Sequence, residues 1–181
     1  LVYAKNADRA KTGLLGRTES MDSRYTNPDE DTNGRWASSD ATAPEYRKTG
    51  TYAIQSPFSG KLFYPARGHW RLETSEMKKL LQSWGSSYVA KKFDDNCEAN
   101  ALVLKGCKFN GNEPILTDPM IIAARKNADA RLAQLNWPNL IFTEGGKGGP
   151  RSRAHLTKLR KGKIPMIYWA NEDYEAPLEI E

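Results

Sequence analysis

Basic side chains are concentrated between residues 147 and 163, a segment with seven Lys and Arg residues and no Asp or Glu. The rest of the chain has a net charge of −2, although the whole chain carries +5. A local excess of guanidinium and ammonium groups is typical of a surface that binds a polyanion such as nucleic acid. The candidate DNA-binding residues of this basic segment are Lys147, Arg151, Arg153, His155, Lys158, Arg160, Lys161 and Lys163.

Two pairs of adjacent basic and aromatic residues lie in a polar stretch nearer the N-terminus. They are Arg24-Tyr25 and Arg35-Trp36. Aromatic rings beside basic groups can stack on bases while the cations contact phosphates, so these four residues are also candidates for DNA binding. For Trp36 the alternative, a side chain buried in the core, fits the sequence equally well.

Metal and nucleotide sites are not expected in this chain. The possible zinc ligands Cys97, Cys107, His69 and His155 do not form the close pairs that fix a tetrahedral zinc site. Gly146-Lys147-Gly148 lacks the Ser or Thr that follows the lysine of a phosphate-binding P-loop. Two cysteines are too few for a disulfide framework, so we expect reduced thiols in an intracellular protein.

A metal-dependent nuclease is the enzymatic alternative. One large class of nucleases holds magnesium with a Pro-Asp and a Glu-x-Lys motif, whose lysine polarises the attacked phosphate. The chain contains Pro28-Asp29 and Glu76-Met77-Lys78. The two motifs are far apart, and the second lies in a predicted amphipathic helix, so chance occurrence is the simpler explanation.

Four sections of different composition divide the chain. Residues 1–8 are typical of the end of a strand, residues 9–50 of an extended loop rich in turn formers, and residues 171–181 of an acidic linker. Residues 51–170 contain the regular patterns and are the predicted main domain. Their short helices and strands predict an α+β fold with small, mainly antiparallel sheets. No apolar run approaches the roughly 18 residues of a membrane span.

The periodicity predicts the following elements within the main domain. Residues 51–54 and 61–64 alternate as a hairpin, next to which residues 70–72 could pair. Apolar spacing predicts helices over residues 74–84 and from Asp118-Pro119 to about residue 135. Further strands are predicted at residues 88–93, 101–104, 140–143 and 164–169, a flexible hinge at 145–150, and a basic helix at 151–160.

Apolar side chains on one face of each helix predict what it buries. The helix that starts at Asp118 is expected to bury Ile121, Ile122, Ala128, Leu132 and Leu135. The basic helix is expected to turn Leu156 and Leu159 to the core. Its Lys and Arg side chains would then face solvent, where Lys158 and Lys161 would contact phosphates and Arg151 and Arg153 would read bases.

Motifs at both ends of the chain match one family. Residues 24–36 are similar to its Arg-Tyr-x-Asn-Pro-Asp-x-Asp-x-x-Gly-x-Trp segment, and residues 1–5 to the strand that ends its catalytic half. Further matches are Ser56-Pro57, Gly60-Lys61, Pro65, Gly68, Trp70, Arg71, Pro150-Arg151, Leu156 and residues 162–169. Together these segments resemble the type III restriction-modification adenine methyltransferases. Residues 85–145 show no match, as expected for a segment that varies with the DNA sequence read.

The resemblance implies a non-catalytic part of such an enzyme. In this family, with its β-type motif order, the catalytic Asp-Pro-Pro-Tyr motif precedes the recognition domain, and the glycine motif for S-adenosylmethionine follows it. No two prolines are adjacent here, and Phe142 is followed two residues later by Glu144, so neither motif is present. The chain is therefore expected to hold no cofactor, and S-adenosylmethionine would bind elsewhere in the parent site-specific DNA methyltransferase.

The resulting expectation is a target recognition domain, residues 51–170, that binds double-stranded DNA in the bacterial cytoplasm. Its partners would be a second copy in a Mod dimer and a restriction subunit. Residues 1–8 and 171–181 would lead to the missing catalytic and cofactor-binding halves. The alternatives are the nuclease and a subunit-docking module of a restriction-modification complex, which would expose a large apolar surface.

Overall fold

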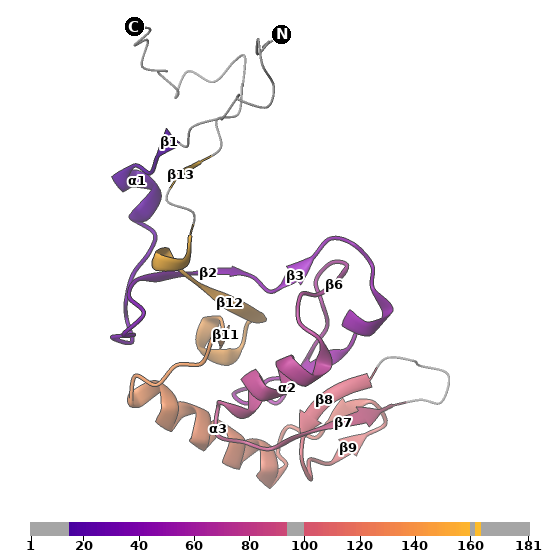
Figure 1. The fold of residues 1–181 in the computed structure, drawn as a ribbon. Coiled ribbons are helices and arrows are strands. Elements are labelled where there is room, and N and C mark those ends of the chain that lie inside the picture. Colours follow the sequence, from indigo (N-terminus) through magenta and orange to yellow (C-terminus); the bar gives the residue numbers. More distant parts are fainter. Residues whose placement is uncertain (1–14, 94–99, 160–161, 164–181) are drawn as a thin grey trace, which may run out of the picture. The chain divides into compact units, whose positions relative to one another are not determined.

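The computed structural model describes residues 15–93, 100–159 and 162–163, and it has the expected α+β composition (Figure 1). Tyr25–Lys158 form one compact unit, and the other described residues belong to a second. In the second unit, β1 (Leu15–Gly16) pairs antiparallel with β13 (Gly162–Lys163), and the side chain of Thr18 caps the short helix α1 (Glu19–Asp22). The sequence predicted that the main domain begins at residue 51, whereas the compact unit of the structure begins at Tyr25.

A four-stranded sheet carries the core of the compact unit. Its order is β5-β4-β8-β7, from β5 (Leu62–Phe63), β4 (Ala53–Gln55), β8 (Asn100–Leu104) and β7 (Tyr88–Lys92). The predicted hairpin is confirmed, because β4 pairs antiparallel with β5. The strands predicted at residues 88–93 and 101–104 are confirmed as β7 and β8, which also pair antiparallel.

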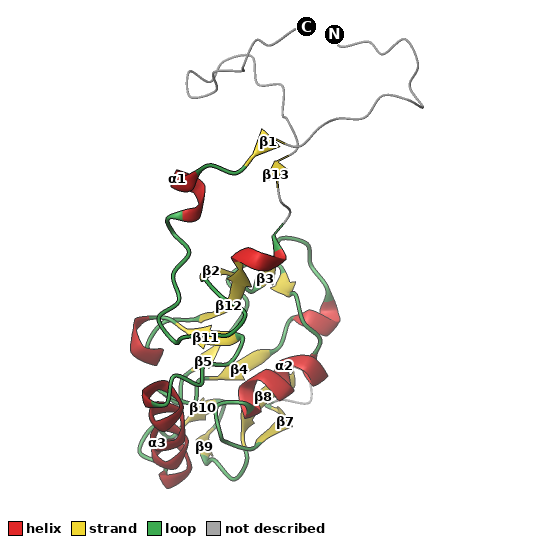
Figure 2. Ribbon diagram, turned by 60° about the vertical axis from the view of Figure 1, so that its left-hand side comes forward, coloured by secondary structure: helices red, strands yellow, loops and turns green. Residues whose placement is uncertain are grey.

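Two helices cover one face of this sheet (Figure 2). Both were predicted, and they are α2 (Thr74–Gln82) and α3 (Pro119–Ala133). The carboxylate of Asp118 caps α3 by accepting the N–H of Met120, and Pro119 begins the helix without needing a backbone donor. Met77 and Leu81 of α2 and Ile121 and Ala128 of α3 are fully buried in one cluster against the sheet.

The burial expected for α3 is only partly correct. Ile122 and Leu135 are exposed, since the buried stripe runs through Ile121, Ala124 and Ala128. Ile122 lies one residue beside that stripe, about 100° around the helix. Leu135 lies beyond the end of α3.

The prediction of a basic helix at residues 151–160 is wrong, because residues 151–155 belong to a strand of a three-stranded sheet. Residues 150–155 form the strand β12 (Pro150–His155), which lies between β11 (Leu140–Phe142) and β2 (Trp36–Asp40) and pairs antiparallel with both. Only the short turn η3 (Leu156–Lys158) follows it, and Leu156 and Leu159 are half-buried. Pairing with strands on both sides satisfies the backbone hydrogen bonds of this segment in an extended conformation. The helical spacing of Leu156 and Leu159 therefore does not decide its conformation.

The predicted flexible hinge at residues 145–150 is instead a packed hairpin loop. It contains the turn η2 (Glu144–Gly146), in which Gly146 is buried with φ +88° against the ring of Phe58. The hydroxyl of Ser56 donates a hydrogen bond to Gly146 O at a distance of 3.3 Å. These contacts fix the loop between β11 and β12.

Smaller pairings complete the described fold. β3 (Thr42–Ala43) pairs with β6 (His69–Trp70), so the residues predicted to extend the first hairpin pair elsewhere. β9 (Phe109–Asn110) pairs with β10 (Glu113–Pro114), and η1 (Lys48–Gly50) is a single turn. The predicted elements at residues 1–8, 164–169 and 171–181 lie outside the described residues.

Candidate functional site

The loop from Asn27 to Asn33 is closed by its own side chains. Asn27 Oδ1 accepts the N–H of Asp31 at 2.8 Å, and Asn27 Nδ2 donates to Asp31 O at 3.1 Å. Asp31 Oδ1 in turn accepts the backbone and side-chain N–H groups of Asn33, both at 2.8 Å. Asx turns of this kind let a short polar loop fold without backbone ladders. They leave Asp31 Oδ2 to bind elsewhere.

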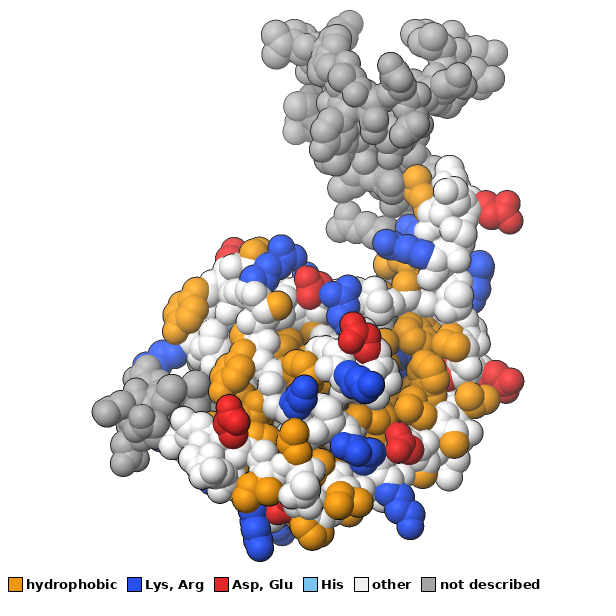
Figure 3. Space-filling model, turned by 180° about the vertical axis from the view of Figure 1, so that it is seen from behind, with side chains coloured by type: hydrophobic (Ala, Val, Ile, Leu, Met, Phe, Trp, Pro, Cys, Tyr) orange, Lys and Arg blue, Asp and Glu red, His pale blue; other side chains and the backbone are white. Residues whose placement is uncertain are grey.

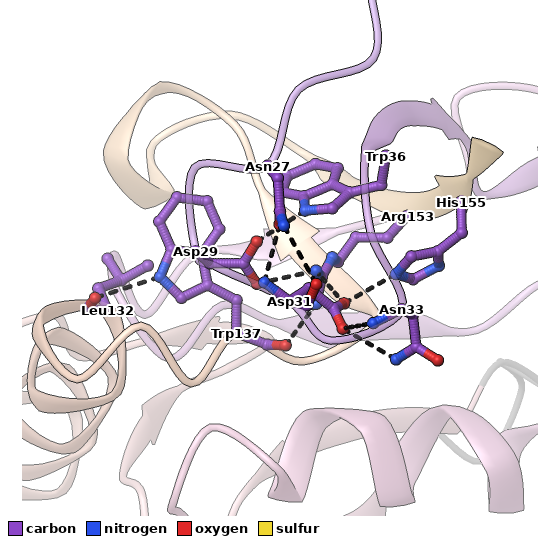
Figure 4. A network of polar contacts seen from close by, with 9 residues as sticks. All are labelled: Asn27, Asp29, Asp31, Asn33, Trp36, Leu132, Trp137, Arg153 and His155. Atoms are coloured by element: carbon purple, nitrogen blue, oxygen red, sulfur yellow. Dashed lines mark hydrogen bonds and ion pairs between the residues drawn. The ribbon is translucent and has the colours of Figure 1, made fainter. Parts of the chain in front are cut away.

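Asp31 Oδ2 contacts an arginine and a histidine of β12 (Figure 4). Arg153 Nη2 lies 2.5 Å from Asp31 Oδ2 and 2.8 Å from Asp29 Oδ2, and His155 Nε2 donates to Asp31 Oδ2 at 2.8 Å. The backbone hydrogen bond from Asn33 lowers the pKa of Asp31 well below its usual range, although burial opposes it. Hydrogen bonds from His155 and the Asn33 side chain and the charge of Arg153 act in the same direction.

The Arg153 guanidinium also contacts an aromatic ring and a backbone oxygen. It lies 4.6 Å from the centroid of the Trp36 ring, and Arg153 Nη1 donates to Trp137 O at 2.7 Å. Trp36 Nε1 donates to Asp29 Oδ1 at 2.7 Å, and the Trp36 and Trp137 rings meet edge to face. The side chains of Arg153 and Asp29 are 3% and 2% exposed. The ion pairs are therefore internal to the fold.

Four of the predicted DNA-binding residues are consequently not available at the surface. Tyr25, Trp36 and His155 are buried, and Arg153 is ion-paired within the fold. The expectation that Arg153 faces solvent is wrong, because β12 turns it toward two carboxylates, and this burial argues against a role in reading bases. The alternative of a core position is correct for Trp36.

Asp29, a metal ligand in the nuclease alternative, also takes part in these internal contacts. Both oxygens of Asp29 are engaged, one by Trp36 and one by Arg153. Glu76 pairs with Lys79 on the exposed face of α2. Among the described residues, no group of three or more His, Cys, Asp and Glu side chains could hold a metal ion.

The other predicted residues that the structure describes remain exposed or half-exposed. In the compact unit these are Arg35, Lys147, Arg151 and Lys158, and Arg24 is exposed in the second unit. Leu156 N donates to Arg35 O at 2.8 Å, so Arg35 lies beside the start of η3, the turn that ends at Lys158. Arg160 and Lys161 lie outside the described residues, as does the side chain of Lys163.

A cavity of about 680 Å³ opens beside the internal ion pairs. The 29–33 loop and Arg153 line one side of it, and Arg131 and residues 135–139 line the other. Leu135 adopts φ +55° at its rim, which few non-glycine residues do. Of the three acids that line the cavity, Asp29 and Asp31 are paired with Arg153, and Glu30 is exposed. A second cavity of about 360 Å³ lies between Ser87, Lys105 and α3.

Sequence reasoning missed a cluster of arginines around Asp40. Arg67 Nη2 lies 3.2 Å from Asp40 Oδ2, and Arg151 Nη1 lies 3.6 Å from Asp40 Oδ1. Arg71 Nε donates to the backbone oxygen of Thr42 at 2.8 Å, two residues after Asp40. The pairing of β6 with β3 brings Arg67 to the Asp40 carboxylate and Arg71 to the backbone of Ala41 and Thr42.

The face seen from behind relative to Figure 1 has a mixed distribution of charge among the described residues (Figure 3). Lys and Arg side chains on that face are spread among acidic, apolar and other side chains and are not gathered in one patch (Figure 3). A mixed face of this kind is typical of ordinary solvated surface.

Comparison of the chain with models of protein families, with curated proteins and with solved structures found no match. Among the described residues, no helix is both long and apolar enough to span a membrane.

Proposed function

We propose that this chain is the DNA recognition domain of a site-specific DNA adenine methyltransferase of a type III restriction-modification system. The domain binds duplex DNA and has no catalytic activity by itself. The parent enzyme supplies S-adenosylmethionine and the catalytic motif. A second copy of the enzyme and a restriction subunit are the partners proposed for it in a bacterial cytoplasm.

The observation that carries this proposal is the interlocking of the two segments that resemble the family. Arg153, which lies two residues after the matched Pro150-Arg151, is ion-paired with Asp29 and Asp31 of the earlier matched segment. Trp36 and His155 are also directly opposite each other in the β2–β12 register. The strand that contains Pro150-Arg151 therefore packs against the earlier matched segment, which supports treating the two matches as parts of one domain.

The charge of the compact unit supports DNA as the ligand. Between residues 25 and 158 the sequence has 19 Lys and Arg residues against 14 Asp and Glu. Exposed cations of the three-stranded sheet and its loops, among them Arg35, Lys147, Arg151 and Lys158, are suited to contact phosphates. Such contacts position a protein on DNA without reading its sequence.

Salt dependence tests this function directly. The 181-residue chain is titrated into a fluorescent duplex of random sequence at several salt concentrations, with affinity read from anisotropy. Each neutralised phosphate releases counterions, so the logarithm of the affinity should fall steeply and linearly with the logarithm of the salt concentration. Absence of binding at low salt, or binding that salt does not change, would contradict the proposal.

Two variants refine the assignment of phosphate contacts. Lys158→Ala and Lys161→Ala should each weaken binding to every duplex alike and lower the salt slope by about one unit. Discrimination between sequences should be weak, because the proposed catalytic half that holds the DNA from the other side is absent. Selection from a random duplex library would show little enrichment if this is correct.

A subunit-docking module is the second candidate, favoured by exposed apolar side chains around the start of α3. Ile115, Leu116, Met120 and Ile122 are between 39% and 58% exposed. Exposed apolar residues that lie near one another can mark a protein interface. This candidate predicts no affinity for DNA at low salt, so the same titration separates it from the first.

A further inference from the structure

Three arginines from two parts of the chain lie around the end of β2. Arg151 lies directly opposite Asp40 in the β12–β2 register, and Arg67 belongs to the turn before β6. Arg71 follows β6 and donates its backbone N–H to Ala41 O at 3.0 Å. Asp40 lies between Arg67 and Arg151 and pairs with both. The group has three cations and one anion.

The backbone fixes the positions of these side chains. Gly68 adopts φ +55°, and any Cβ there would collide with the carbonyl oxygens of Ala43 and Glu45. This close approach places Arg67 beside Asp40. Thr42 Oγ1 donates to Asp40 Oδ1 at 3.2 Å and orients the carboxylate. Burial opposes a lower pKa of Asp40, but the Thr42 hydrogen bond and the charges of Arg151 and Arg67 lower it.

Most donors of these arginines remain available. A guanidinium has five N–H groups. Asp40 engages one terminal nitrogen of Arg67 and one of Arg151, and Thr42 O engages only the Nε of Arg71. The side chain of Arg67 is 63% exposed and that of Arg151 is 38% exposed. The fold therefore holds the three side chains at the surface with unused donors.

We propose that Arg67, Arg71 and Arg151 form one contact site for the phosphate backbone of duplex DNA, with Asp40 as the positioning residue. Guanidinium groups bind phosphate oxygens through paired N–H donors, which gives both strength and orientation. The side chains of Arg67 and Arg71 are exposed, and neither they nor Arg151 line the two cavities described above. An open row of cations suits an extended polyanion better than a small anion, which needs enclosure. This inference rests on the proposed function and assigns its DNA-facing surface.

Anisotropy titrations of a fluorescent 30-base-pair duplex test the site. Arg67→Ala, Arg71→Ala and Arg151→Ala should each weaken binding about three- to tenfold at low salt and lower the salt slope by about one unit. Lys79→Ala is the matched control, because Lys79 is also exposed and paired with one acid, yet lies on α2. It should bind within about twofold of the unchanged chain. Circular dichroism spectra and melting curves verify that every variant is folded.

Asp40→Asn provides a test in the opposite direction. The amide keeps one of the two oxygens that the arginines pair with and removes the negative charge that repels phosphate. The variant should therefore bind DNA about two- to fivefold more tightly. If the unchanged chain binds with a steep salt slope but the arginine variants bind like Lys79→Ala, this inference fails and the proposed function stands. If the unchanged chain does not bind DNA at low salt, both fail.

Discussion

Arg153 Nη2 lies 2.5 Å from Asp31 Oδ2, although 122 residues separate the two in the sequence. The same guanidinium pairs with Asp29 and lies over the ring of Trp36. These contacts hold the 27–33 loop against β12. The basic segment therefore supplies both an internal ionic contact and surface cations, and the two roles can be separated by mutation.

Loss of Arg153 should strongly destabilise the fold. Arg153→Met keeps much of the packing on Trp36 but leaves two carboxylates without their cation, which should cost about 3–5 kcal/mol in the free energy of unfolding. Arg151→Met, its neighbour on the same face of β12, should cost less than about 1 kcal/mol, because Arg151 is partly solvated. Urea denaturation compares the two variants.

Removal of the acids tests the cause of this loss. Asp29→Asn and Asp31→Asn, added to Arg153→Met, should recover part of the lost stability because no buried charge then lacks a partner. An Arg153→Met variant as stable as Arg151→Met would show that the internal ion pairs contribute little.

Acidification should weaken the fold through Asp31. Its pKa in the folded state lies below the ordinary value of 3.8, because it accepts the Asn33 backbone N–H and contacts His155 and Arg153. A carboxyl group with a lowered folded pKa stabilises the fold above its unfolded pKa and loses that contribution as the pH falls further. The unchanged chain should therefore lose more stability than Asp31→Asn between about pH 5 and pH 2. Parallel curves for the two proteins, from denaturation at each pH, would refute this.

The glycine-rich loop between β11 and β12 should behave as packed structure. A Cβ at Gly146 would collide with the Phe58 side chain, whereas at Gly145 it would meet nothing within 4 Å. Both residues have positive φ, so both alanine variants carry similar backbone strain. Gly146→Ala should be less stable than Gly145→Ala by about 1–3 kcal/mol, the usual cost of overpacking. Equal melting temperatures would instead indicate a flexible hinge.

Leu135 should be a strained end to α3. Its N–H donates to Leu132 O at 3.1 Å and that of Asn136 to Arg131 O at 3.0 Å, a Schellman pattern that favours glycine at this position. At φ +55°, Leu135→Gly should be more stable than Leu135→Ala by about 1 kcal/mol. Both variants remove the side chain, so the comparison isolates the backbone. A more stable alanine variant would exclude strain here.

Local chemistry was sufficient for several elements. Asp118 and Pro119 begin α3 because a cap and a residue without a backbone N–H suit a helix start, whatever lies nearby. Apolar spacing identified α2 through Met77 and Leu81, and the turn after Gln55 identified the β4–β5 hairpin. The density of basic residues and the motif around Asp29 and Asp31 could also be read from the sequence, and with them the proposal of DNA binding.

Tertiary pairing decided what the sequence alone could not. Residues 151–160 have leucines at helical spacing, but β12 pairs with β11 and β2, and Arg153 meets two carboxylates 122 and 124 residues away. The same pairing places Arg153 in the interior and Arg151 partly at the surface, and the separate pairing of β3 with β6 brings Arg67 to Asp40. A sequence lists charges in order, whereas their exposure depends on which distant backbone each strand pairs with, because burial of a charge is favourable only beside a partner.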